Sequence, residues 1–519
     1  MPTSTNPRLA AGIFAVVLLV AVFSWWMSLA PSPLPADAPK EAFSAYRALE
    51  HVKAMAVEPH PGGSHANEKV YDYIIGQLRG LGVEMTVERP IMRMERHTVE
   101  RNGAILARLR GEDSTGAFAV DAHFDSTPYG PGAADDVGGC AAMLETIRAL
   151  NSGPKLKNDI IFCFSDKEEM GGQGGPGVFM RHDWFKDVKA LLGLETRGTA
   201  GPALMFETGQ ENGFMIRQLA KSDARPRATS IMFDFYDRMP FGSDFSNYKD
   251  AGIPGMNVAY IDDFCYYHTK NDSPEHLSLA SLQHHGQYTL GLCRQFGDVS
   301  LENCKAPNAT YFNTIGSQMV VYPRSWGRPL AIAILVLFLA VLIAGCVRGG
   351  LSIRGMLAGA AIFPLVTLLT FPGLAYFAWT VIFLRFREHA LYRNDSSSLA
   401  VMLIGLGVLV LCAALVRRVR PQNLLAGALL WWAAGLAFLE FGLPGFAIQA
   451  MKAHGIGLKG IEYGLQGGAY AMLWPLFFAT FGLLALFHSP EGEAALSPKR
   501  YALAAVSILP AVIILVPSL

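Results

Sequence analysis

The sequence predicts an α/β domain with a mostly parallel, helix-covered sheet, followed by an all-α transmembrane bundle. Two observations predict the first part: between residues 40 and 300, short apolar runs alternate with amphipathic stretches, and several apolar runs end on an acid or a histidine. A third predicts the second part, because long uncharged apolar runs dominate from about residue 329. We expect an N-terminal transmembrane anchor at 1–31, the α/β domain at 32–305, a linker at 306–328 and a multi-span domain at 329–519.

The N-terminal segment is the first apolar run. Residues 9–30 hold about twenty uncharged residues, which is long enough to cross a bilayer. A cleaved signal peptide is the alternative, but this run is long for one and carries Trp25 and Trp26, a residue type that favours membrane interfaces. We therefore expect a retained anchor, followed by a short Pro-rich spacer.

Within the α/β domain, each element is predicted from its own pattern. YDYIIGQLRGLG and AAMLETIRAL have the apolar spacing of helices, whereas IIFCF and VKALLGLET are apolar throughout, as expected of buried strands. We expect helices at 71–82, 141–150 and 276–296, and strands at 83–90, 104–111, 116–123, 160–164 and 188–196.

The strand at 116–123 ends on a candidate metal ligand. His123 is followed two residues later by Asp125, and on an extended backbone both side chains point to the same face. A carboxylate beside the second nitrogen of a histidine fixes the ring tautomer and raises its basicity, which is common around metal-bound histidines. We expect His123 to bind metal and Asp125 to orient it.

Acidic side chains in two loops extend the pattern. Asp135 lies in PGAADDVGG, a turn-forming loop ahead of a helical pattern, where a carboxylate could bridge two ions. Glu168 and Glu169 follow the strand IIFCF, at the kind of strand end where ligand sites collect in α/β sheets. Adjacent glutamates allow a division of roles, so we assign Glu169 as a ligand and Glu168 as general base.

Two further ligands complete the set. Glu195 ends an apolar strand, and His268 lies in YYHTKNDSPEH, shortly before a predicted helix start at Ser273–Pro274. Asp272 and Ser273 are expected to cap that helix rather than bind metal. We expect all five ligands to lie in loops at strand ends: His123, Asp135, Glu169, Glu195 and His268.

Imidazole and carboxylate groups at this spacing predict a hydrolase that holds two divalent cations and one activated water. Taken alone, a His-x-Asp pair or an acidic dipeptide is usually a solvated surface feature, and roughly one such match in ten marks a metal site. Their joint occurrence after successive apolar strands favours the metal site. We expect Glu168 to take a proton from the water and to return it to the leaving amine.

The motifs PHPGGSHANEKVYDYI, AHFDS, PGAADD, KEE, GLE, SDFSNYKDAGIPG and YHTKNDSPEHLSLASLQ occur in an order that resembles metallopeptidase family twenty-eight, the co-catalytic zinc aminopeptidases. Residues 40–300 are similar to the membrane-bound branch of that family, which includes the endoplasmic reticulum metallopeptidase and the vacuolar membrane protease. The resemblance implies a zinc aminopeptidase fold, two zinc ions per chain, peptide substrates and a free N-terminus bound near the metals.

The resemblance also implies a role for each residue. It places the bridging aspartate at Asp135. The other ligands of one ion fall on His123 and Glu195, and those of the second ion fall on Glu169 and His268. The general base falls on Glu168, and the aspartate that orients the histidine falls on Asp125. Some members have lost ligands and act as receptors, and others bind one zinc and cyclise glutamine. The complete set here favours a working peptidase.

Two positions depart from the family pattern. Gly193 stands where the membrane-bound branch tends to carry asparagine, and Pro240 lies near the place of a tyrosine that stabilises the oxyanion in soluble members. The oxyanion donor is therefore open, with Tyr266 and Tyr267 as nearby candidates. The glycines of GGQGGPG lack the Lys-Ser/Thr of a phosphate loop and are expected to form a flexible rim beside the site. Other histidines have no identifiable partner and are expected to be structural or solvated: His60, His65, His182, His284 and His285.

Six further apolar runs follow, at 329–347, 355–384, 398–416, 423–447, 463–487 and 501–518. A soluble core could contain one or two such runs, but six in roughly two hundred residues predict transmembrane helices. The run at 355–384 contains Pro364 and Pro372, so it is either one tilted span or a re-entrant pair. Glu440 lies within an apolar run, where it either serves a function or pairs with a neighbouring helix.

Basic residues predict the orientation of these spans. If the first helix runs outward and 355–384 is one span, then Arg348, Arg354, the basic cluster at 417–420 and Lys499–Arg500 all fall on the cytoplasmic side, as the positive-inside rule requires. Arg385, Arg387 and Arg393 are exceptions in this arrangement. We expect the α/β domain to lie outside the cytoplasm, in a bacterial periplasm or a eukaryotic lumen.

Composition limits the other functions. Equal numbers of basic and acidic residues, 43 each, provide no basic field for nucleic acid, and 51% hydrophobic content fits a protein embedded in a lipid bilayer. Two alternatives to a working peptidase stay open: an inactive receptor or scaffold, and a transporter-like membrane protein with an accessory peptidase domain. Cleavage preference, oligomeric state and the choice of zinc over other divalent ions are also open.

Overall fold

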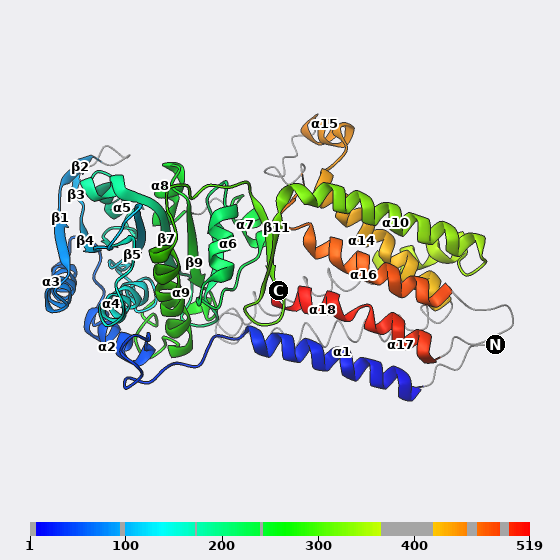
Figure 1. Cartoon of the computed structure of the whole chain (residues 1–519), viewed down its shortest axis with the longest axis horizontal. Helices are drawn as coiled ribbons and strands as arrows, with labels where there is room; N and C mark the ends of the chain where they lie inside the picture. Colours follow the sequence, from blue (N-terminus) through cyan, green and yellow to red (C-terminus); the bar gives the residue numbers. More distant parts are fainter. Residues whose placement is uncertain are drawn as a thin grey trace. The chain divides into compact units, whose positions relative to one another are not determined.

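The computed structural model describes residues 7–93, 99–171, 174–238, 242–364, 419–453, 464–487 and 498–518 (Figure 1). The chain forms two compact units. One, Met27–Arg324, is called the α/β unit below; the other, Met1–Trp26 with Ser325–Leu519, is called the apolar unit.

A seven-stranded mixed sheet forms the centre of the α/β unit. Its strands lie in the order β1 (Glu84–Glu88), β4 (Ala104–Leu109), β6 (Asp159–Ser165), β5 (Ala117–His123), β7 (Val188–Thr196), β9 (Gly255–Tyr260) and β8 (Leu204–Thr208). The neighbours from β6 to β9 pair in parallel, whereas β1, β4 and β8 pair antiparallel to their neighbours. The predicted α/β fold is confirmed, and its parallel part is the central four strands.

The sheet is covered by helices on both faces. Alternate residues of β6 belong to different apolar clusters: Ile160, Phe162 and Phe164 to one, Ile161 and Cys163 to the other. The larger cluster contains residues of α2 (Ala45–Met55), α3 (His65–Gly80), α4 (Val137–Asn151), α6 (Gly213–Lys221) and α9 (Leu279–Asp298). The smaller cluster contains residues of α5 (Gly174–Phe179) and α8 (Asp244–Asp250). The alternation explains why the central strands read as continuous apolar runs.

Two local predictions within this unit are wrong. The last long helix, α9, begins at Leu279 with Ser278 as its N-cap, so the predicted start at Ser273–Pro274 does not form. Gly174 and Gly175, expected in a flexible rim, begin helix α5. A Cβ on Gly175 would collide with Ser165 at the end of β6, so this glycine permits close packing of helix on strand.

Residues predicted as a linker at 306–328 include a β-hairpin. Its strands are β10 (Ala309–Asn313) and β11 (Met319–Pro323), and it packs against α6 and α7 (Ser230–Tyr236). Arg324, directly after β11, forms a 2.6 Å ion pair with Asp234 of α7. A second two-stranded ribbon joins β2 (Ile91–Arg93) to β3 (Val99–Arg101).

Helices are the regular secondary structure of the described residues of the apolar unit, and turns separate them. Its helices are α1 (Pro7–Ser28), α10 (Gly327–Val347), α14 (Pro421–Phe441), α15 (Gly445–Ala453), α16 (Tyr470–Phe487), α17 (Pro498–Val506) and α18 (Leu509–Leu515). Three apolar segments in the described part are long enough to cross a membrane: Ala11–Ser28, Arg324–Val347 and Pro421–Phe441. Shorter apolar helices occur at Ile353–Pro364, Tyr470–Leu486 and Ala502–Leu515. The predicted span at 398–416 and most of the run at 355–384 lie outside the described residues.

Glu440 is buried near the end of α14. A Cβ on Gly327, the first residue of α10, would touch its carboxylate, so Glu440 packs against the start of α10. Helix N-termini favour a nearby negative charge, because their first N–H groups have no acceptor within the helix. The contact supports the interpretation that Glu440 pairs with a neighbouring helix.

Candidate metal centre

Asp135 lies at the centre of the candidate site, in the loop that joins β5 to α4. Asp272 fixes this loop: its carboxylate accepts from the N–H of Ala134 at 2.7 Å and of Asp135 at 3.2 Å, and its carbonyl accepts from Ala133 N–H at 3.1 Å. Asp272 was expected to cap a helix, and that expectation is wrong. The sequence carried no signal for its actual partners, which lie more than a hundred positions away.

The five predicted ligands form two groups that share Asp135. One group is His123, Asp135 and Glu195, and the other is Asp135, Glu169 and His268. In each group one ligand atom per residue lies within 4.8 Å of the others. His123 is the last residue of β5 and Glu195 lies within β7, so these two belong to strands rather than to loops.

Short contacts surround the Asp135 carboxylate. Its Oδ2 lies 3.1 Å from His268 Nε2, and its Oδ1 lies 3.5 Å from His123 Nε2. His268 Nε2 is also 2.9 Å from Glu169 Oε1. These distances suit groups that converge on a small cation.

Unpartnered polar atoms test whether metal ions fit here. Among the described residues, His123 Nε2, Asp135 Oδ2 and His268 Nε2 are buried and form no well-directed hydrogen bond, although the distances between the imidazoles and the Asp135 carboxylate are short. A buried polar atom left unpaired is costly, so such atoms are normally satisfied by protein, water or an ion. Imidazole nitrogen and carboxylate oxygen are the ligands that zinc takes in catalytic sites, and the residues present therefore fit two ions.

Asp125 holds the next part of the site. Its carboxylate accepts the main-chain N–H of Glu168 at 3.0 Å and of Glu169 at 3.3 Å. The Nδ1 of His123 lies 3.0 Å from the Asp125 carbonyl oxygen and 3.5 Å from its carboxylate. Asp125 thus contacts both His123 and the Glu168–Glu169 segment, and the main-chain oxygen is the nearer acceptor for the imidazole.

Glu168 is close enough to act on a molecule at the centre. Its carboxylate forms a third group with His123 and Glu169, again within 4.8 Å. Lys167, directly before it, has a φ of 72°, and His268 has a φ of 56°. Such conformations are uncommon outside glycine and persist only where surrounding contacts fix them, so both segments are held in place.

Burial and mutual charge perturb the titration of this set. Burial raises the pKa of Glu169 to about 7 and raises the pKa of Glu168 and Glu195. Burial acts in the same direction on Asp135, but the imidazoles of His123 and His268 hold the pKa of that carboxyl below its usual range. The excess of buried carboxyl groups favours a bound cation.

Tyr267, one of the two oxyanion candidates, lies at this site together with Arg197, which sequence reasoning did not assign. Tyr267 stacks on His268, with ring centroids 3.7 Å apart, and its hydroxyl accepts from Arg197 Nη1 at 3.0 Å. Tyr266 instead lies against His276, at 4.8 Å between centroids. The Tyr236 hydroxyl is buried without a partner among the described residues. Pro240 lies outside the described residues.

Gly193, at the position where the membrane-bound branch tends to carry asparagine, lies next to an asparagine of the adjacent strand. It pairs with Asn257 across β7 and β9, and a Cβ on Gly193 would lie 2.9 Å from Asn257 Oδ1. The Asn257 amide donates to Ser243 at 2.9 Å and to Glu207 at 3.3 Å. The adjacent strand therefore supplies an asparagine next to this position.

Histidines outside the site have structural partners. His284 Nδ1 accepts the Ala203 N–H at 3.0 Å, and its Nε2 lies 3.0 Å from Arg225 O. His285 Nε2 lies 3.3 Å from Val258 O, and His182 caps a short helix at Asp183–Asp187. These three are structural, as expected.

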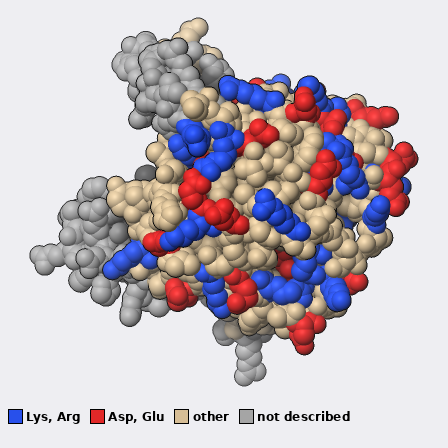
Figure 2. Space-filling view, turned by 90° about the vertical axis from the view of Figure 1, so that its left-hand side faces the viewer, with Lys and Arg blue, Asp and Glu red and all other residues tan. Residues whose placement is uncertain are grey.

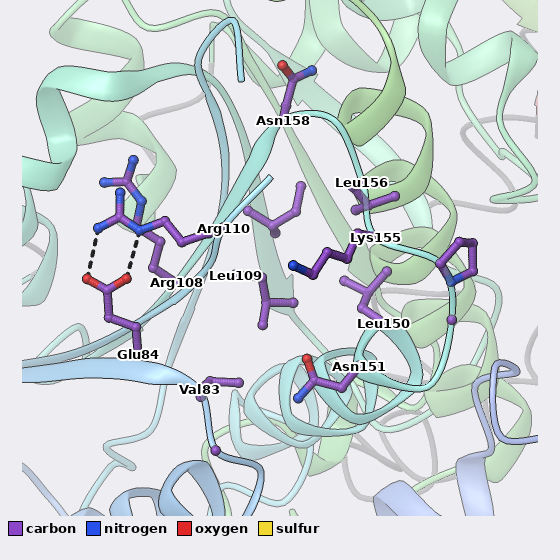
Figure 3. A pocket seen from close by; sticks show the side chains of 14 residues that line it. Val83, Glu84, Arg108, Leu109, Arg110, Leu150, Asn151, Lys155, Leu156 and Asn158 are labelled. Atoms are coloured by element: carbon purple, nitrogen blue, oxygen red, sulfur yellow. Dashed lines mark hydrogen bonds and ion pairs between the residues drawn. The ribbon is translucent and has the colours of Figure 1, made fainter. Parts of the chain in front are cut away.

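A cavity of about 340 Å³ lies elsewhere in the α/β unit, between β1, β4 and the loop after α4 (Figure 3). Leu109, Leu150 and Leu156 face it, while Arg110 turns away and pairs with Glu84. None of the predicted ligands lines it. On the face shown in Figure 2, acidic and basic side chains are interspersed, without a broad patch of one sign.

Three comparisons relate the chain to known proteins. A family model described as Peptidase family M28 matches residues 104–293. Mouse endoplasmic reticulum metallopeptidase 1 is 26% identical over 307 residues, which cover 54% of this chain and 34% of the mouse protein. The vacuolar membrane protease of Candida tropicalis is 32% identical over 242 residues, which cover 44% of this chain and 26% of that protein. The chain thus matches about a third or less of the length of these relatives.

Among solved structures, an aminopeptidase from Aneurinibacillus sp. strain AM-1 is similar to part of the chain. It has a TM-score of 0.42 and 14% sequence identity, and the match covers 52% of this chain and 98% of the aminopeptidase.

Proposed function

Residues 104–293 form a domain of peptidase family M28, as the motifs predicted, and we propose that the chain is a membrane-anchored dinuclear zinc aminopeptidase. It removes N-terminal residues from peptides outside the cytoplasm. The observation that carries this proposal is the pair of three-residue groups that share Asp135. Such sharing is the arrangement expected where one carboxylate bridges two ions.

In the proposal, His123 and Glu195 complete the ligands of one zinc ion, and Glu169 and His268 complete those of the other. Bound zinc supplies a Lewis acid for the substrate carbonyl and lowers the pKa of water at the site. Asp125 orients His123 and fixes the Glu168–Glu169 segment. Asp272 holds the bridging aspartate in position.

Glu168 is proposed as the general base and acid. Its carboxylate takes a proton from the attacking water and delivers it to the leaving amine. Tyr267 is the better of the two tyrosine candidates for the oxyanion, because it contacts His268 while Tyr266 faces His276. Its hydroxyl accepts a hydrogen bond from Arg197, which leaves its own proton available for donation.

The aminopeptidase specificity rests on the family resemblance of the motifs, and the non-cytoplasmic location rests on the distribution of basic residues. Named relatives are proteases of endoplasmic reticulum and vacuolar membranes, which fits a peptidase unit attached to apolar helices. A complete ligand set argues against an inactive receptor or scaffold. Among the described residues, nothing specific favours a transporter.

The direct test is metal content together with hydrolysis. Full-length protein in detergent is assayed for bound metal and for release of amino acids from a panel of aminoacyl chromogenic substrates, before and after chelation. We expect about two zinc ions per chain and activity that a chelator abolishes and zinc restores. Metal without turnover would favour a receptor role, and absence of metal would contradict the proposal.

A further inference from the structure

Arg197 lies beside the candidate metal centre, and no carboxylate of the described residues forms an ion pair with it. Its N–H bonds to Tyr260 O at 3.0 Å, so the chain stays extended beyond the end of β7. In an extended chain, residues two apart project from the same face, which directs Arg197 to the side of Glu195. Its contact with Tyr267, which stacks on His268, connects it to the second ligand group as well.

The guanidinium group keeps donors available. Nη1 donates to the Tyr267 hydroxyl at 3.0 Å and Nη2 donates to Gly242 O at 3.3 Å. A guanidinium has five N–H donors, so three remain after these two. Within the described residues, no carboxylate forms an ion pair with Arg197, in contrast to Arg324, which pairs with Asp234.

Tyr236 adds a second unused donor. Its hydroxyl is buried and has no hydrogen-bond partner among the described residues. Burial is the main cause of its raised pKa, and the charges of Glu207, Arg197 and Glu195 also act on it, which puts this hydroxyl in the same part of the site. A buried hydroxyl donor and a guanidinium with free N–H donors are both groups that favour a bound anion.

We propose that Arg197, together with the Tyr236 hydroxyl, binds a carboxylate of the substrate within one residue of the scissile amide. This inference rests on the proposed peptidase function. Guanidinium binds carboxylate through paired N–H donors, which gives geometric selectivity as well as attraction. Among the carboxylates of a peptide that lie this close, the proposal takes two: the C-terminus of a dipeptide, and the side chain of an N-terminal Asp or Glu.

Matched acid and amide substrates test the proposal and distinguish the two sources. Zinc-loaded full-length protein is assayed on alanyl-alanine against alanyl-alanine amide, and on glutamyl against glutaminyl p-nitroanilide. A hydrogen bond to a charged group predicts a kcat/KM roughly 10- to 100-fold higher for the acid of one pair. The pair that shows this preference identifies the source of the carboxylate.

Variants assign the preference to its residues. Arg197→Gln is expected to remove it, Arg197→Lys to keep part of it, and Tyr236→Phe to reduce it by a smaller factor. Arg181→Gln and Tyr46→Phe delete the same groups at exposed positions without contacts to the site, and they should keep the wild-type ratio. Zinc content and the thermal midpoint are measured for each variant, so that a folding defect is recognised.

Equal kcat/KM for acid and amide in both pairs of the wild type would overturn the inference. If the wild type hydrolyses none of the substrates, the proposed function fails, and the inference is decided by binding. The same dipeptide and its amide are then titrated calorimetrically into wild type and Arg197→Gln. Tighter binding of the acid that depends on Arg197 supports the carboxylate site, and equal binding of acid and amide contradicts it.

Discussion

At the residue scale, Glu168 and Glu169 are neighbours in the chain and both lie near His123, but only Glu169 also belongs to the group with Asp135 and His268. Glu169 contacts His268 at 2.9 Å, whereas the Glu168 carboxylate lies in the group formed with His123. Asp125 accepts the main-chain N–H of both residues, which fixes the direction in which each side chain leaves the loop. Under the proposed function, this arrangement fits separate roles for the two carboxylates, Glu169 as a ligand and Glu168 as the general base.

Replacement of Glu168 by glutamine tests its role. Glu168→Gln keeps the size of the side chain but cannot take a proton, so we expect kcat to fall by a factor of about 10² to 10⁴. The zinc content should stay at the wild-type value, because Glu168 is not in either proposed ligand set. Elemental analysis and steady-state kinetics measure the two quantities, with exposed Glu302→Gln as the control. Wild-type kcat in Glu168→Gln would remove this residue from the role.

His284, whose ring contacts Ala203 and Arg225, gives a pH-dependent contribution to stability. Its Nδ1 accepts an N–H, so the folded protein holds the ring neutral, and burial lowers the pKa of His284 to about 3. An unfolded histidine takes up a proton near pH 6.5. The unfolded state therefore binds more protons between these values, and stability is full above pH 6.5 and lost as the pH falls.

His284→Gln removes this titration while keeping one acceptor and one donor. Below pH 6, the free energy of unfolding of the wild type should fall relative to that of His284→Gln. The expected fall is up to about 1.4 kcal/mol per pH unit. Denaturant unfolding of both proteins at pH 5, 6, 7 and 8 measures this difference. A difference independent of pH would show that His284 is not neutral in the folded state.

At the element scale, local sequence patterns predicted the elements whose structure depends on burial. They did not predict elements whose structure depends on a partner far away in the sequence. Strands β5, β6 and β7 follow directly from their apolar runs. Ser273–Pro274 is a good local start signal for a helix, yet the helix begins at Leu279, because Asp272 is used to hold the Asp135 loop. The candidate ligands could be predicted from their motifs, whereas Arg197 and Tyr236 could not, since nothing in the sequence brings them together.

Asp272 should matter for metal affinity although it is not a proposed ligand. In Asp272→Asn, the amide can present only one oxygen to the two N–H groups of Ala134 and Asp135, so the loop loses part of its support. Loss of such supporting groups lowers metal affinity by about 10- to 100-fold. Competition with a calibrated chelator measures this affinity, and exposed Asp298→Asn serves as control. Unchanged zinc affinity would mean that the loop holds Asp135 without Asp272.

Replacement of glycine by alanine is expected to have opposite effects on stability at two positions. A Cβ on Gly286 of α9 would collide with the ring of Phe43, which is buried and has little room to move. Overpacking of this kind costs about 1–3 kcal/mol, so Gly286→Ala should lower the free energy of unfolding. Gly76 of α3 has nothing within 4 Å of such a Cβ, so Gly76→Ala should raise stability by about 0.5–1 kcal/mol. Denaturant unfolding measures both, and equal signs would contradict the packing argument.

At the scale of the whole molecule, the two units differ in the side chains that they expose. The α/β unit has a central sheet with apolar clusters on both faces, whereas the apolar unit exposes large side chains such as Phe14, Val336 and Trp431. Exposed side chains of this kind, on helices that carry one charged residue each, fit a lipid environment. The proposed function requires the hydrophilic unit to meet peptides on one side of that membrane.

The charge distribution predicts which side this is. Arg348 follows α10 directly, and Arg420 precedes α14, so the ends of two candidate spans carry basic residues. Since such residues stay in the cytoplasm, the opposite end of α10, where the α/β unit ends, should lie outside. Labelling of single introduced cysteines tests this orientation. The background protein has Cys265, Cys346 and Cys412 replaced by serine. In intact cells, a membrane-impermeant maleimide should label Asp113→Cys but not Val347→Cys, and permeabilisation should expose Val347→Cys. The reverse pattern would place the peptidase unit in the cytoplasm, where the basic residues of this chain would oppose the positive-inside rule.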